Sequence, residues 1–127
     1  MWIFTNKAAV SVVQDWSNPL HYWVRSRTKG QVEAFCAPLE RRVKVEVTPK
    51  NDYAYRTKVT LGDLETLALA SVRSIDYTNF KDSIVDNKFH SACSKVWSAL
   101  MTACGTGCYA TPKKRAKGIK QTDFVWP

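Results

Sequence analysis

The hydrophobic period of this 127-residue chain changes once, close to residue 60. Before that position apolar and polar side chains alternate, most plainly where Val43, Val45 and Val47 are separated by Lys44 and Glu46. A period of two is typical of half-buried strands. After that position apolar residues recur at the spacing of an amphipathic helix. Strands that come first and helices that come later predict an α+β fold rather than a doubly wound sheet.

Turn residues divide the first part of the chain into short extended segments. Pro19 and Pro49 lie in polar stretches that interrupt the alternation, and Pro38 closes a short helical stretch expected at residues 31–36. Hairpins are expected to join the first two strands and the last two. The expected strands cover residues 2–4, 9–14, 21–27, 43–47 and 53–60.

The later part of the chain carries two helical patterns. Thr60, with Asp63 three residues on, has the spacing of a capping box at a helix start. Gly105 is a natural stop for the second helix. The predicted buried stripe of the first helix is Leu61, Leu64, Leu67, Ala68, Val72 and Ile75, and that of the second is Phe89, Cys93, Val96, Trp97, Leu100 and Met101.

These elements predict a two-layer sandwich, in which an antiparallel sheet of about five strands has helices packed on one face. An apolar content of 45% is enough for one modest core, so residues 1–111 are expected to form a single α+β domain. Residues 112–127 lack an apolar period until Phe124 and are expected to form a basic, flexible tail.

The formal net charge of +8 favours an anionic partner, which could be a nucleotide, a nucleic acid or an acidic protein. No apolar run approaches the roughly 18 residues that a membrane span needs, and no secretory leader is recognisable. A cytoplasmic protein without a membrane partner is therefore expected. The four cysteines are expected to be reduced and structural, because their spacing is not that of a zinc site.

Motifs that support catalysis are missing from the sequence. It has no phosphate-cradling glycine loop, no HExxH and no Gly-x-Ser-x-Gly elbow. His90 and Cys93 could share a helix face, but a core cysteine beside a surface histidine explains the same spacing. We therefore expect a binding protein that is not an enzyme and holds neither a metal nor a cofactor.

Cationic side chains at strand positions are the most informative candidates for a binding site. Arg25 and Arg27 share one face of a strand, and Arg56 and Lys58 share a face of another. Arginine forks match phosphate oxygens, and nearby aromatic rings could hold a base. The alternative is that these cations form a solvated sheet face without a ligand, and the sequence leaves both open.

The tail has two interpretations of its own. Half of the net charge lies there, since its five cations and Asp123 sum to +4. The tail could be a phosphate-binding arm or a solubilising terminus. If it binds nucleic acid, the contacting residues are expected to be Lys113, Lys114, Arg115 and Lys117.

Several segments resemble a small family of bacterial and phage proteins of similar length. The similarity spans about residues 1–101, and its most specific part is Ile-Asp-Tyr-Thr-Asn-Phe-Lys-Asp at residues 75–82. The other segments are Met-Trp-Ile-Phe-Thr-Asn at residues 1–6, Val-Arg-Ser-Arg at 24–27, Asp-Tyr-Ala-Tyr-Arg at 52–56 and Val-Trp-Ser-Ala-Leu at 96–100.

The pattern also resembles phage anti-Thoeris proteins, which oligomerise and sequester cyclic nucleotide signals without cleaving them. That resemblance implies a homo-oligomeric counter-defence protein in a bacterial host cell. It also implies that Arg25 and Arg56 hold the nucleotide with Phe80, and that Asn79 assists. Lys95 stands where the pattern has an arginine, and a lysine does not reproduce a bidentate fork. The alternative function is a nucleic-acid-binding or protein-interaction module that uses the basic surface and tail.

Overall fold

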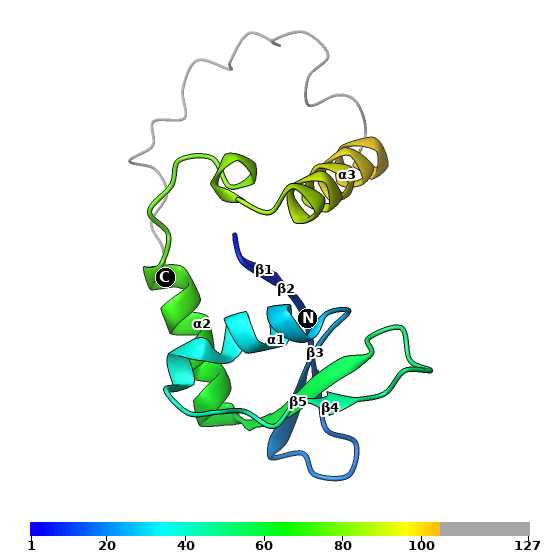
Figure 1. Ribbon diagram of the computed structural model, residues 1–127, viewed down its shortest axis with the longest axis vertical. Helices are drawn as coiled ribbons and strands as arrows, with labels where there is room; N and C mark the ends of the chain where they lie inside the picture. Colours follow the sequence, from blue (N-terminus) through cyan, green and yellow to red (C-terminus); the bar gives the residue numbers. More distant parts are fainter. Residues whose placement is uncertain (105–127) are drawn as a thin grey trace, which may run out of the picture. The chain divides into compact units, whose positions relative to one another are not determined.

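The computed structural model of the protein describes residues 1–104, and Figure 1 shows their arrangement as a ribbon. The chain divides into two compact units, Met1–His90 and a second that begins at Ser91. The predicted domain boundary at residue 111 and the helix stop at Gly105 lie outside the described residues. The elements are β1 (Trp2–Phe4), β2 (Ala9–Gln14), β3 (His21–Ser26), α1 (Lys29–Cys36), η1 (Ala37–Leu39), β4 (Glu46–Val47), β5 (Tyr55–Thr60), α2 (Leu61–Arg73), η2 (Lys81–Ser83) and α3 (Asn87–Ala103).

The five strands form one sheet in the order β1-β2-β3-β5-β4, and every neighbouring pair is antiparallel. Both predicted hairpins are present, because β1 pairs with β2 and β4 pairs with β5. α1 and α2 each contact β3 and β5. The structure thus confirms the predicted α+β class with an antiparallel sheet.

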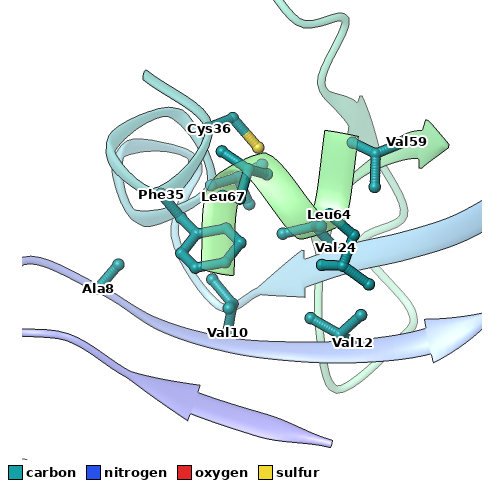
Figure 2. Packing of buried hydrophobic residues seen from close by; sticks show 10 residues of the cluster. Ala8, Val10, Val12, Val24, Phe35, Cys36, Val59, Leu64 and Leu67 are labelled. Carbon is teal, nitrogen blue, oxygen red and sulfur yellow. The ribbon is translucent and has the colours of Figure 1, made fainter. Parts of the chain in front are cut away.

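The hydrophobic core lies between the sheet and these two helices (Figure 2). Val12 and Val24 are cross-strand partners in the centre of the sheet, and both are buried. Leu67 of α2 is fully buried. The cluster is completed by Ala8, Val10, Val32, Phe35, Cys36, Val59 and Leu64. Because successive side chains of a strand point to opposite faces, the sequence neighbours of the buried valines lie on the other face of the sheet.

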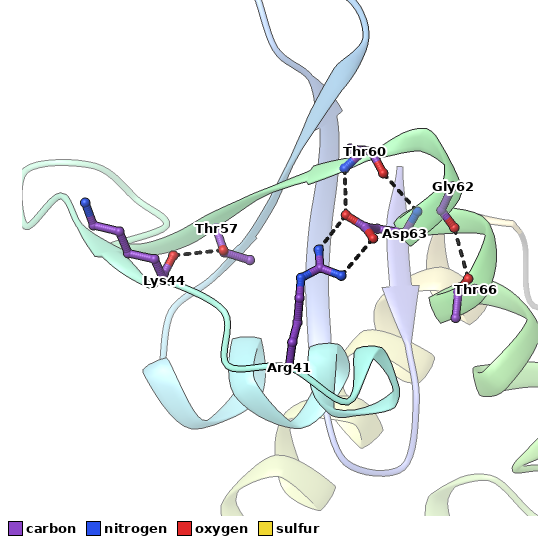
Figure 3. Close-up of polar contacts among 7 residues, drawn as sticks. All are labelled: Arg41, Lys44, Thr57, Thr60, Gly62, Asp63 and Thr66. Carbon is purple, nitrogen blue, oxygen red and sulfur yellow. Dashed lines mark hydrogen bonds and ion pairs between the residues drawn. The ribbon is translucent and has the colours of Figure 1, made fainter.

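The start of α2 is fixed by the predicted capping box (Figure 3). The Asp63 amide donates to Thr60 Oγ1 at 3.1 Å, and the Thr60 amide donates to Asp63 Oδ2 at 3.0 Å. The Arg41 guanidinium donates to both oxygens of Asp63, at 3.0 and 2.7 Å. The Arg41 hydrogen bond, followed by those from Thr60, lowers the pKa of Asp63 to about 2. The loop before β4 is thereby attached to the first turn of α2.

Replacing the capping hydroxyl should weaken this corner of the fold. Thr60→Ala is expected to lower the free energy of unfolding by roughly 0.5 to 2 kcal/mol, because the Asp63 amide loses its acceptor. Thr60→Ser should restore most of the loss. Thr66→Ala is the matched control, since Thr66 Oγ1 donates to Gly62 O in the same helix and alanine favours a helix interior. Urea denaturation of the three variants would contradict the assignment if the two alanine variants lost equal stability.

The strand predicted at residues 43–47 is reduced to Glu46–Val47. Val43 and Val45 are half-buried and pack against the core, so their alternation with lysine reflects packing. Thr57 Oγ1 donates to the Lys44 carbonyl at 2.8 Å, so a side chain of β5 holds this backbone (Figure 3). The prediction of a long fourth strand was wrong because a hydrophobic period of two does not require ladder hydrogen bonds.

The buried stripe predicted for α2 was wrong over its second half. Leu64 and Leu67 are buried, whereas Leu61 and Ala68 are exposed and Val72 is 65% exposed. Ile75 lies beyond the helix, which ends at Arg73. Only the first two turns of α2 bury leucines, so helical period alone overestimated the length of the buried face.

α3 covers the second helical pattern, and its predicted stripe is partly correct. Phe89 and Cys93 are buried, whereas Val96, Trp97 and Leu100 are exposed. The predicted link before it contains the short helix η2. None of the helices within residues 1–104 is both long and apolar enough to cross a bilayer.

Candidate functional site

The sheet face opposite α1 and α2 carries the cationic side chains singled out in the sequence. On β3, Val24 and Ser26 are buried toward the core, so Trp23 and Arg25 lie on the other face. On β5, buried Thr57 and Val59 place Arg56 and Lys58 there in the same way. We call this surface the open face and define it by Trp2, Phe4, Ala9, Ser11, Val13, Trp23, Arg25, Arg56 and Lys58.

Arg25 and Arg56 are direct cross-strand partners. Side chains in such positions have Cβ atoms about 4.5 to 5.5 Å apart, and like charges there destabilise a sheet. Neither arginine has a carboxylate within ion-pair distance in residues 1–104, although Glu46 is in register with Arg56 on β4. The Nε donors of both arginines are buried and have no hydrogen-bond partner in that part of the chain. Two adjacent positive charges are thus left without a counter-ion.

Aromatic rings and polar groups hold the arginines in place. The Tyr53 ring lies 5.0 Å from the Cζ atoms of both Arg25 and Arg27, and the Trp23 ring lies 5.7 Å from Arg56 Cζ. Arg25 Nη2 also donates to Ser11 Oγ at 2.8 Å, and Arg56 Nη2 donates to the Tyr53 carbonyl at 3.5 Å. Cation–π contacts leave the hydrogen-bonding edge of a guanidinium available for an anion.

Lys58 differs from the arginines because it has an acid partner. Its Nζ lies 2.6 Å from Asp15 Oδ2 and 4.7 Å from the centre of the Trp23 ring. Trp23 Nε1 donates to Asp15 Oδ1 at 3.2 Å. The Lys58 hydrogen bond, with those from Ser17 and Trp23, lowers the pKa of Asp15 to about 2 although burial opposes the shift. Asp15 therefore neutralises Lys58 and orients Trp23.

The Asp15 contact should make the fold sensitive to acid. A carboxyl whose pKa is lower in the folded state stabilises the protein above its unfolded value near 3.8 and loses that contribution as the pH falls toward 2. The stability difference between wild type and Asp15→Asn should therefore narrow between pH 4 and pH 2. Thermal melts across that range test this, with exposed Asp76→Asn as the control. A difference that stays constant with pH would contradict an ionic role for Asp15.

The structure brings three of the predicted site residues together. Arg25, Arg27 and Arg56 gather around Tyr53 and Trp23. The centroid of the Phe80 ring lies 6.1 Å from that of the Tyr77 ring, and Asn79 Oδ1 accepts a hydrogen bond from the Asp82 amide at 3.2 Å. Phe80 and Asn79 therefore each contact a residue close by in the sequence. Their binding role stays a prediction. Lys95 is an exposed residue of α3, in the second unit, and Lys113, Lys114, Arg115 and Lys117 lie outside the described residues.

Sequence reasoning missed two residues that shape the site. Asp15 follows β2 in a turn, and no second carboxylate near it in the sequence marked it as a site residue. Its role depends on Lys58, which approaches it from a strand that is distant in the sequence. Ser11 lies on β2 in register with Arg25. The predicted hairpin of residues 2–14 could have indicated that Ser11 faces away from Val10 and Val12, but not that Arg25 would reach it.

Within the described residues we find no cluster of metal ligands and no thiol that is suited to nucleophilic attack. No group of three or more His, Cys, Asp or Glu within residues 1–104 is arranged to hold a metal ion. Burial raises the pKa of the Cys36 thiol to about 11 and also raises that of Cys93, which disfavours the thiolate that a nucleophile needs. The His90–Cys93 pair considered from the sequence is therefore poorly suited to nucleophilic catalysis.

A second basic surface is less suited to an anion. A hollow of about 340 Å³ is lined by Val43 and Val45 together with Lys29, Glu33, Arg42 and Lys44. Glu33 Oε1 lies 3.4 Å from Lys29 Nζ, so one of the three cations is already paired. The net charge of the lining is therefore +2, one less than that of Arg25, Arg27 and Arg56 together.

No protein-family model, curated protein or solved structure matches this chain.

Proposed function

We propose that the open face binds a phosphate-bearing nucleotide and holds it unchanged, so that the protein sequesters a nucleotide-derived immune signal. The observation that carries this proposal is the cross-strand pair of Arg25 and Arg56, which lacks an acid partner in the described residues. Arg27, stacked on the Tyr53 ring that also contacts Arg25, adds a third positive charge beside the pair.

Electrostatics favour an anion at this position. Two like charges directly opposite each other cost stability in a sheet, and a phosphate between them would replace repulsion with attraction. Each charge-assisted hydrogen bond contributes about 1.5 to 3 kcal/mol. Guanidinium forks also match phosphate oxygens in pairs, which a solvated lysine does not.

Binding without cleavage follows from the chemistry of the contacting groups. Arginine remains protonated at physiological pH and has no acceptor, so it can hold a phosphate but cannot take a proton from an attacking water. Asp15, whose carboxylate lies beside Trp23, is already engaged by Lys58 and Trp23. Its lowered pKa makes it a weak base.

A sheet face gives limited affinity by itself. Two arginine contacts and one stacked base would supply roughly 4 to 9 kcal/mol before ordering costs. Sub-micromolar binding therefore requires further groups, and a homo-oligomer could supply them from a second copy. Phe80 and Asn79 belong to the proposal as contacts that the resemblance implies, and Phe80→Ala tests that part separately.

Ligand release identifies the bound molecule directly. The protein is purified from a host that makes nucleotide signals, heated, and the supernatant analysed by mass spectrometry. Calorimetry against cyclic ADP-ribose isomers and cyclic di- and trinucleotides then measures the affinity. We expect an intact nucleotide that rebinds fresh protein.

Two outcomes would contradict the proposal. A cleaved product would indicate an enzyme. Failure to bind any nucleotide, with salt-sensitive binding to random DNA that disappears on truncation after Pro112, would favour the nucleic-acid alternative, in which the basic tail makes the contacts.

A further inference from the structure

Two aromatic rings on β1 lie on the open face without a ring or cation contact in the described residues. Ile3 packs against the core, so its neighbours Trp2 and Phe4 point to the opposite side of the sheet. Trp2 is 70% exposed and Phe4 is 38% exposed. Trp23 and Tyr53, in contrast, each have two cations against their rings. The β1 rings are therefore the ones available to stack on a ligand.

Small side chains separate these rings from the arginines. Trp2 is in register with Ser11, and Phe4 is in register with Ala9. Ser11 is in turn opposite Arg25, which reaches across to donate to the Ser11 hydroxyl at 2.8 Å. Aromatic rings on β1, small residues on β2 and Arg25 on β3 thus form three neighbouring strips, and Arg56 follows on β5.

The spacing of the strips fits a nucleotide. Adjacent strands lie about 4.8 Å apart, so the backbones of Trp2 and Arg25 are separated by about 10 Å, and the Arg25 side chain shortens that distance by leaning over Ser11. A base on the Trp2 ring and a phosphate on the guanidinium are then within the span of a single nucleotide. Trp2 and Phe4, two residues apart on one strand, are about 7 Å apart. Two bases that are splayed apart can each lie on one ring.

We propose that Trp2 and Phe4 stack on two neighbouring bases of a dinucleotide whose linking phosphate lies on Arg25 and Arg56. This inference rests on the proposed function and deepens it, because it assigns the ligand two bases joined by a phosphodiester. The charge of the unpaired arginines complements that phosphate, and the rings tolerate any base because every base has a π-face.

Thymidine ligands of increasing length test the two-base requirement. Calorimetry is performed on the full chain with the mononucleotide pT, the dinucleotide pTpT and an oligothymidylate of about eight nucleotides, which is within the range of single-strand binding sites. One stacked base corresponds to roughly 5- to 150-fold in affinity. We expect pTpT to bind at least about 5-fold more tightly than pT, and the longer strand to bind no more tightly per site than pTpT.

Variants of β1 test whether the higher affinity for pTpT comes from the Trp2 and Phe4 rings. Trp2→Ala and Phe4→Ala should each remove most of the difference between pTpT and pT, whereas Trp2→Phe should keep it. Trp16→Ala is the matched control, because Trp16 is 99% exposed and lies in the turn after β2. Thermal melts of each variant show whether the fold is intact, and Trp2→Phe keeps the test valid if Trp2→Ala unfolds.

The outcomes separate this inference from the proposed function. Equal affinity for pT and pTpT, or a gain that survives Trp2→Ala, would overturn the two-base assignment while leaving nucleotide binding intact. Affinity that continues to rise from pTpT to the longer strand would overturn it in favour of a nucleic-acid strand. Absence of binding to all three thymidine ligands and to the cyclic nucleotides tested above would remove the proposed function itself.

Discussion

Leu67→Ala is expected to lower the free energy of unfolding by roughly 2 to 5 kcal/mol. Leu67 is fully buried in the cluster between α2 and the sheet, so truncation removes apolar contacts and leaves a cavity. Its neighbours in that cluster come from strands and from α1, which limits collapse around the gap. Such a loss is a large fraction of the stability of a small domain, typically 5 to 15 kcal/mol.

Leu69→Ala is the matched control for this prediction. Leu69 lies two residues further along the same helix and is 50% exposed, so the same substitution removes the same atoms without opening a cavity. Its expected effect is within about 0.5 kcal/mol, since alanine also favours a helix interior. Equal losses in urea denaturation of the two variants would mean that the buried face of α2 is assigned wrongly.

Local sequence signals predicted the elements of this fold more accurately than their extents. The capping box at Thr60 and Asp63 and the two hairpins were predictable, because they depend on residues a few positions apart. The lengths of the fourth strand and of the buried face of α2 depend on distant partners. Val43 and Val45 pack on the core while their backbone is held by Thr57, which lies on another strand. Periodicity indicates which side chains are buried and does not indicate where ladder hydrogen bonds end.

The candidate site was predictable to a similar degree. Alternation placed Arg25 on one face of its strand and Arg56 on one face of another. That the two strands are adjacent and in register at these residues is a property of the sheet order, in which β3 pairs with β5 instead of β4. The contact of Arg25 with Ser11 depends on the separate pairing of β2 with β3. The sequence could therefore nominate the cations but could not show which of them share a site.

Removing either arginine of the cross-strand pair should weaken nucleotide binding by roughly 10- to 150-fold, the equivalent of one charge-assisted contact of about 1.5 to 3 kcal/mol. Arg25→Ala and Arg56→Ala test the two contacts, and calorimetry with the ligand recovered from the purified protein measures them. The corresponding lysine variants keep the charge but lose the fork, so they should recover only part of the affinity.

The effect of these variants on folding should be much smaller than their effect on binding. Arg56→Ala gives up a cation–π contact with Trp23 but also removes the repulsion between Arg25 and Arg56, and these contributions are each about 1 kcal/mol or less and of opposite sign. A binding site for an anion has this signature, because the like charges are placed for the ligand rather than for the fold.

Arg42→Ala is the charge-matched control, since it removes one exposed arginine from the hollow beside α1. It should leave nucleotide affinity within about twofold when long-range attraction is screened by salt. Equal weakening by Arg42→Ala and Arg56→Ala would mean that the net positive charge attracts the ligand without a defined site. Loss of stability in Arg56→Ala comparable to that in Leu67→Ala would mean that the pair supports the fold.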